Sequence, residues 1–82
     1  MKTIAIELVF FAALRERFGA RMRRDVPRGT TVRRLWREVA GASPGLSRLP
    51  VRFAVREEYV EPRYVVRAGD EIAVFPPVSG GA

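Results

Sequence analysis

The residues best suited to chemistry lie at the end of the chain, where a strand-forming pair is followed by two prolines and a tip of small residues. The segment reads Val74-Phe75-Pro76-Pro77-Val78-Ser79-Gly80-Gly81-Ala82. The prolines remove two backbone donors and fix φ, so a strand must end before them. Beyond them the chain carries almost no side chain, and its backbone can pass where a bulkier segment would clash.

A proline-stiffened stem with a glycine tip offers a backbone carboxyl group at a defined distance from a folded body. From Pro76 to Gly81 the chain extends to roughly 20 Å at about 3.3 Å per residue, which is enough to reach into another protein. Such a stem also loses less ordering entropy on binding than a Gly/Ser linker. A terminal glycine pair is commonly just disordered, but the proline pair favours a reactive tail over that interpretation.

The rest of the chain lacks the side chains that most catalytic sites use. It contains no Cys and no His, and Asp occurs only at Asp25 and Asp70. This composition removes the thiol nucleophile, the usual proton shuttle and nearly every common set of metal ligands. Glu57 and Glu58 are adjacent carboxylates, but two acids at a turn are more typical of a solvated corner than of acid–base catalysis. We therefore expect the chain to have no active site of its own.

At 82 residues the chain has room for one domain with a small core. We divide it into a folded domain, residues 1–75, and an extended reactive tail, residues 76–82. No apolar run approaches the ~18 residues that span a bilayer, and the start lacks the pattern of a secretory signal. We therefore expect a cytoplasmic protein with no membrane partner.

Basic residues outnumber acidic ones by 15 to 9, which gives a net charge of +6, and every basic residue except Lys2 is Arg. Such a charge favours polyanions or an acidic partner. The basic residues are scattered, however, and the lack of Asn, Gln, Cys and His fits a compositional bias of a GC-rich genome or a hot habitat. We therefore expect no nucleic-acid partner, and keep a small nucleic-acid-binding module as the rival supported by charge alone.

The hydrophobic pattern predicts strands separated by two helices. Alternating apolar residues indicate strands over residues 2–11, 20–26 and 51–55, a hairpin return at Tyr59-Val60, a short extended piece at 64–66 and a last strand at 71–75. A short helix is predicted over residues 12–18, ending at Gly19. A second helix, capped by Thr30 or Thr31, carries a core-directed stripe that includes Trp36 and ends at Gly41. Residues 42–50 are expected to form a loop.

This order of elements predicts an α+β fold, a β-grasp (ubiquitin-like) roll in which one main helix packs on a mixed sheet of four or five strands and a flexible Gly-Gly tail follows. In that fold the first and last strands lie side by side in parallel at the centre of the sheet. Phe11 then lies near the root of the tail. We expect an apolar shoulder there, which serves as the docking surface and consists of Phe11, Phe75, Pro76, Pro77 and Val78.

Segments along most of the chain resemble the small subunit of molybdopterin synthase, the MoaD family. They are Leu8–Glu16, Phe53–Val60 and Gly69–Gly81. The last is the most specific, because it combines Gly-Asp-Glu, a strand, Phe-Pro-Pro-Val and Gly-Gly in the spacing of the family. The thiamine-pathway sulfur carrier ThiS shares the diglycine end but is less similar around Phe-Pro-Pro.

The resemblance implies a non-catalytic sulfur carrier within an enzyme complex. In that family an activating enzyme uses ATP to adenylate the carboxyl group of the terminal glycine. A persulfide sulfur donor then replaces the adenylate, and the thiocarboxylate enters the large synthase subunit, where sulfur is moved onto a pterin precursor of the molybdenum cofactor. Carried onto this sequence, Gly81 bears the reactive carbonyl, and Ser79 and Gly80 contact the partners. The resemblance implies no cofactor bound by this chain and a heterotetramer with a large-subunit dimer.

Ala82 departs from the family, whose chains end at the second glycine. Either a peptidase removes Ala82, or the chain is a paralogue with another use, or the alanine is foreign to the natural protein. Two alternatives keep the same chemistry, namely a sulfur carrier for tRNA thiolation or another pathway, and a protein modifier joined through Gly81 to lysines. Because Lys2 is the only lysine, lysine-linked chains of the protein with itself are not expected.

Overall fold

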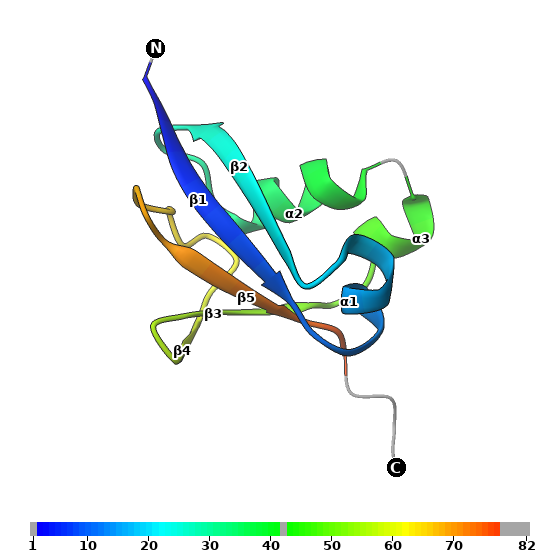
Figure 1. The fold of residues 1–82 in the computed structure, drawn as a ribbon. Helices are drawn as coiled ribbons and strands as arrows, with labels where there is room; N and C mark the ends of the chain where they lie inside the picture. Colours follow the sequence, from blue (N-terminus) through cyan, green and yellow to red (C-terminus); the bar gives the residue numbers. More distant parts are fainter. Residues whose placement is uncertain (1, 42, 78–82) are drawn as a thin grey trace.

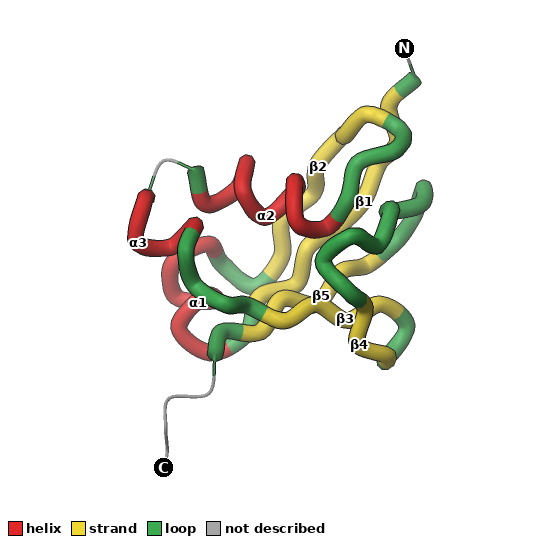
Figure 2. Tube along the Cα trace, turned by 180° about the vertical axis from the view of Figure 1, so that it is seen from behind, coloured by secondary structure: helices red, strands yellow, loops and turns green. Residues whose placement is uncertain are grey.

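The structure is a computed structural model, and it describes residues 2–41 and 43–77 of the chain. Its elements in chain order are β1 (Thr3–Phe10), α1 (Ala12–Phe18), β2 (Arg21–Pro27), α2 (Val32–Ala40), α3 (Pro44–Ser47), β3 (Arg52–Val55), β4 (Glu58–Val60) and β5 (Glu71–Phe75). The strands form one sheet in the order β2-β1-β5-β3-β4. Helix α2 covers one face of this sheet, as the two opposite views show (Figures 1 and 2).

The two most apolar strands lie at the centre of the sheet. β1 pairs with β5 in parallel, from Glu7 beside Glu71 to Phe10 beside Val74, whereas β1–β2, β3–β5 and β3–β4 are antiparallel. Successive side chains of β1 alternate between the faces, and those on the helix side are all buried, namely Ile4, Ile6, Leu8 and Phe10. This is the predicted β-grasp roll, and the predicted parallel pairing of the first and last strands is confirmed.

Helix α2 begins and packs as its sequence predicts. The Thr31 hydroxyl accepts a hydrogen bond from the Arg34 backbone N–H at 3.2 Å, which caps the helix. Its apolar stripe is buried against the sheet, namely Val32, Leu35, Trp36, Val39 and Ala40. The Trp36 ring meets Phe18 of α1 edge to face at 6.0 Å. Trp36 is therefore a core residue, as expected, and burial of a side chain of this kind contributes roughly 2–3 kcal/mol.

Two local features differ from the sequence-based expectations. A short helix, α3, occupies part of the predicted loop, with Pro44 as its first residue and Leu46 packed against the core. The hairpin between β3 and β4 turns on Arg56 and Glu57, whose φ angles are 52° and 67°, so Glu58 belongs to β4 and not to the turn. This left-handed turn matches the twist of paired strands, but its residues are not the Asn and Gly that normally reveal it in a sequence.

Asp70 is a buried carboxylate, only 4% exposed, at the start of β5. It accepts hydrogen bonds from the Tyr64 hydroxyl at 2.9 Å, from the Arg67 backbone N–H at 2.8 Å and from the Arg56 guanidinium at 3.1 Å. The hydrogen bond to Asp70 raises the pKa of Arg56. The sequence indicated only a turn here, whereas the structure shows that Asp70 joins the β3–β4 turn to the loop that leads into β5.

Replacing Asp70 with Ala is expected to lower the free energy of unfolding by about 3 kcal/mol, because it leaves the Tyr64 hydroxyl and the Arg67 N–H without their acceptor. Urea denaturation followed by circular dichroism measures the change. Asp25→Ala is the matched control, since Asp25 is exposed, and its effect is expected to stay within about 0.5 kcal/mol. Equal effects of the two substitutions would contradict a structural role for the Asp70 network.

Alkaline pH is expected to weaken the fold through Tyr64. Burial, the hydrogen bond to Asp70 and the charge of that carboxylate raise the pKa of Tyr64 above its ordinary value of 10.0. The unfolded chain therefore loses this proton first, so the stabilisation is complete below pH 10.0 and is lost as the pH rises through the folded-state pKa. When the free energy of unfolding is measured across this pH range, Tyr64→Phe should remove the alkaline loss of stability. The control, Tyr59→Phe, should retain it. An unchanged pH dependence in Tyr64→Phe would refute the assignment.

Candidate functional site

The candidate site is the root of the tail, where β5 ends. β5 stops at Phe75, and Pro76 and Pro77 follow outside the sheet, as predicted. Val78, Ser79, Gly80, Gly81 and Ala82 lie outside the described residues. Their roles as partner contacts and as the reactive carbonyl therefore stay predictions.

The apolar shoulder is built around two stacked rings. Phe11 lies directly after β1 and before α1, and its ring stacks on Phe75 with centroids 4.6 Å apart and planes 14° apart. The parallel pairing of β1 and β5 places these two residues at the same end of neighbouring strands. Phe11 is 39% exposed, although a ring of this size would be stabilised by burial. The expected proximity of Phe11 to the root of the tail is thus confirmed.

Tyr59 and Arg52 extend the apolar shoulder and were missed by the sequence reasoning. The Tyr59 ring meets Phe75 edge to face at 6.0 Å and is 66% exposed. The Arg52 guanidinium lies 5.5 Å from the centre of the Tyr59 ring, in a cation–π contact. The alternation of side chains along the two strands could have predicted their position. Phe53 and Val60 face the core, so their neighbours Arg52 and Tyr59 must lie on the opposite face of the sheet.

A hollow of about 780 Å³ lies beside these rings. Its lining includes Pro50, Arg52 and Tyr59 and the end of β5 with its two prolines. The surface is mostly aromatic and proline, with one cation at its rim, which is the composition typical of the centre of a protein interface. The hollow is therefore suited in size and composition to binding an apolar side chain of another protein.

The two adjacent acidic residues of the hairpin are both exposed. Glu57 lies in the turn and Glu58 is the first residue of β4, and neither makes an ion pair with another described residue. No cluster of three or more potential metal-binding side chains occurs in residues 2–41 and 43–77. Over the same ranges, no helix is both long and apolar enough to cross a membrane.

Comparison with known proteins finds matches along nearly the whole chain. The profile of the ThiS family matches residues 8–81. The human protein named molybdopterin synthase sulfur carrier subunit is 43% identical, with 93% of each chain covered.

Among solved structures, SAMP1 from Haloferax volcanii is 34% identical with a TM-score of 0.74, covering 94% of this chain and 99% of that one. A putative molybdopterin converting factor, subunit 1, from Pyrococcus furiosus is 26% identical with a TM-score of 0.77, covering 92% and 99%. With a match that reaches from β1 through both glycines, and with relatives covered almost completely, the chain belongs to the ThiS family.

Proposed function

We propose that this protein is the sulfur carrier subunit of a molybdopterin synthase and that Gly81 carries the sulfur as a thiocarboxylate. The observation that carries the proposal is the 43% identity, over 93% of both chains, to a human protein with that name. The diglycine that follows a proline stem, rooted in the apolar shoulder, supplies the group that such a carrier needs.

The chemistry follows from the lack of catalytic groups in the chain itself. A carboxylate is a poor electrophile, so the Gly81 carboxyl group must first receive a good leaving group. Its oxygen attacks the α-phosphate of ATP in the activating enzyme, and pyrophosphate leaves. A persulfide sulfur then attacks the acyl carbon and displaces AMP, and a thiol cleaves the remaining S–S bond to leave the thiocarboxylate. The sulfur donor and the ATP both belong to partners.

The apolar shoulder gives both partners a common docking surface. The stacked Phe11 and Phe75 rings and the exposed Tyr59 ring offer rigid aromatic contacts, which commonly carry most of the energy of an interface. With the shoulder docked, six residues from Pro76 to Gly81 are long enough to reach about 20 Å into the active site of the activating enzyme or of the large synthase subunit. In the latter, sulfur passes to the pterin precursor.

Ala82 must leave before this chemistry begins, because the carboxyl group has to belong to Gly81. We assign its removal to a peptidase of the same cell. We also propose that the cycle runs in the cytoplasm, where the ATP for the activating step is available.

A second candidate function is that of a protein modifier. It is favoured by the 34% identity to SAMP1 from Haloferax volcanii, a chain that another solved structure calls small archaeal modifier protein 1. A modifier forms an amide bond between Gly81 and a foreign lysine, whereas a synthase subunit binds a large subunit tightly without a covalent bond.

Copurification of the tagged chain with the large synthase subunit of the same cells tests the proposal. The complex is expected to form, and Phe75→Ala is expected to weaken it about 30-fold, because truncation removes a central aromatic anchor. Val65→Ala is the control, since Val65 is an exposed apolar residue outside the shoulder, at 48% exposure. Binding constants come from titration calorimetry, with thermal unfolding of each variant to confirm folding.

Two outcomes would count against the synthase assignment. One is a large subunit that does not bind the wild-type chain. The other is recovery of the chain attached through Gly81 to lysines of other proteins, which would favour the modifier.

A further inference from the structure

The outer edge of β2 is an unpaired edge of the sheet. β2 lies at the end of the strand order, and β1 is its only partner strand among the described residues. In an antiparallel pair, residues alternate between those that hydrogen-bond to the partner strand and those whose backbone groups point the other way. The alternation decides which N–H and C=O groups of β2 are left facing outward.

The flanking hydrogen bonds fix this alternation. The Phe10 N–H donates to the Ala20 carbonyl at 3.0 Å, and the Arg28 N–H donates to the Lys2 carbonyl at 3.1 Å. Because the register between these bonds is continuous, the even-numbered residues of β2 face β1. The odd-numbered residues of β1 face β5, as the bond from the Glu7 N–H to the Asp70 carbonyl at 2.9 Å requires.

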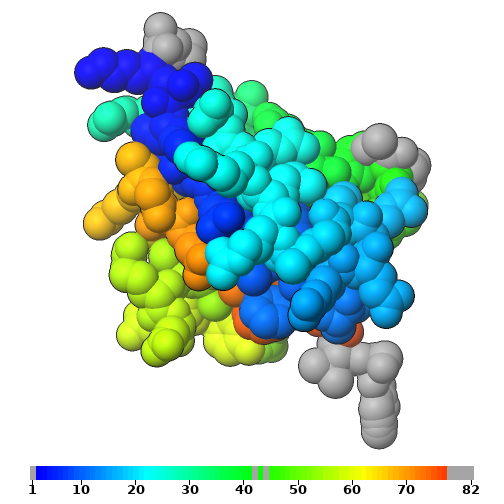
Figure 3. Space-filling model, viewed as in Figure 1, coloured from blue at the N-terminus to red at the C-terminus, as the bar shows by residue number. Residues whose placement is uncertain are grey.

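The outward backbone groups of β2 therefore belong to Arg21, Arg23 and Asp25. The backbone N–H and C=O groups of these three residues make no hydrogen bond with another described residue. All three residues are exposed, and in the space-filling view the atoms of β2 lie uncovered beside those of β1 (Figure 3). This edge has the donors and acceptors that a further strand needs.

Among the charged side chains along this edge, Arg21, Arg23 and Arg24 are basic and Asp25 is acidic. Arg21 is held by Glu7 at 2.8 Å and by Glu71 at 2.7 Å. Arg23 and Arg24 are exposed and form no ion pair with any residue in the described ranges. Strand alternation places Arg23 on the open face of the sheet and Arg24 on the helix face. A strand added here would meet an unpaired guanidinium on each of its faces.

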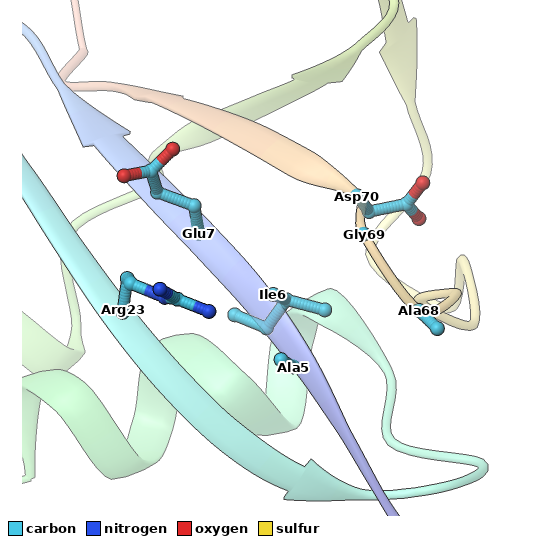
Figure 4. Close-up of a pocket in the computed structure, with 7 residues that line it drawn as sticks. All are labelled: Ala5, Ile6, Glu7, Arg23, Ala68, Gly69 and Asp70. Carbon is cyan, nitrogen blue, oxygen red and sulfur yellow. The ribbon is translucent and has the colours of Figure 1, made fainter.

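The surroundings of Arg23 leave its guanidinium accessible from the open face. Its side chain points from β2 toward β1, beside a hollow of about 320 Å³ (Figure 4). The lining of this hollow includes two small residues, Ala5 and Ala68, and two acidic ones, Glu7 and Asp70. Arg23 forms no ion pair with either carboxylate, so its guanidinium is free to turn toward a carboxylate at the outer edge of β2.

We propose that the outer edge of β2 binds an extended, acidic segment of another protein as an additional strand of the sheet. Backbone hydrogen bonds to Arg21, Arg23 and Asp25 would supply the affinity, and carboxylates paired with Arg23 and Arg24 the selectivity. A second copy of this chain is disfavoured as the added strand. If two β2 strands paired antiparallel about Arg23, the two Arg23 side chains would lie directly opposite each other and their like charges would repel. The site does not depend on the sulfur chemistry, and it lies at the edge of the sheet opposite β4.

Nuclear magnetic resonance on the full, isotope-labelled chain tests the proposal with a synthetic peptide of Val and Thr residues around one central pair of adjacent Glu residues. In an extended strand this pair places one carboxylate on each face, as pairing with both Arg23 and Arg24 requires. Chemical-shift changes are expected along β2, together with slower hydrogen exchange of the Arg21, Arg23 and Asp25 amides. A peptide with Lys in place of Glu should not bind. Two N-methylated versions of the Glu peptide separate strand pairing from charge attraction. One carries methyl groups on the backbone nitrogens of its odd-numbered residues and the other on those of its even-numbered residues. Because only one of these sets of N–H groups faces β2 in a paired strand, only one version should lose binding.

Matched double variants locate the charges involved. Arg23→Glu with Arg24→Glu is expected to weaken peptide binding at least about tenfold. The control, Arg33→Glu with Arg34→Glu, changes the net charge of the protein by the same amount but lies on the exposed face of α2. It is expected to leave peptide binding within about twofold of the wild type. Thermal unfolding of both confirms that they fold.

Several results would overturn the proposal. They are no binding of the Glu peptide at millimolar concentration, equal loss in both double variants, and equal binding of the two methylated peptides. A short single-stranded RNA that displaces the peptide from β2 would assign the edge to nucleic acid instead.

Discussion

The parallel pairing of β1 with β5 determines where the tail of this protein leaves its folded domain. Because the two strands run in the same direction at the centre of the sheet, their ends lie together, and Phe11 stacks on Phe75 immediately before Pro76. The stack of Phe11 on Phe75 depends on this arrangement, whereas Tyr59 and Arg52 join the apolar shoulder through the pairing of β4 with β3 and of β3 with β5. Pro76 and Pro77 lack the backbone N–H groups that a strand needs, so the sheet ends at Phe75.

The other end of β5 is held by a different kind of interaction. Asp70 gathers the Tyr64 hydroxyl, the Arg67 N–H and the Arg56 guanidinium, and its own carbonyl accepts from the Glu7 N–H at 2.9 Å. A polar network thus fixes the start of the strand, and aromatic stacking fixes its end. We infer that this double attachment holds the root of the tail in one position relative to the sheet.

The sequence predicts the sheet, α1 and α2, because alternation and helical periodicity are read locally and the core residues follow them. The proximity of Phe11 to Phe75 could be predicted only after the fold had been assigned, because no local sequence pattern connects residues so far apart in the chain. Tyr59, Arg52 and Asp70 were not predicted as members of the site or of a buried network, because their contacts arise from strand register and burial. The hairpin at Arg56 and Glu57 was predicted, but Glu58 was wrongly included in its turn. Helix α3 was interpreted as loop because it has only four residues, although Ser43 and Pro44 are residue types that commonly begin a helix.

The central claim is that Gly81 becomes a thiocarboxylate. The intact mass of the chain isolated from its own cells, and again after incubation with its activating enzyme, ATP and a sulfide source, tests this most directly. The mass is expected to fall by one alanine and then to rise by the exchange of one oxygen for sulfur. A chain that keeps Ala82 and shows no such exchange would mean that Gly81 does not carry sulfur.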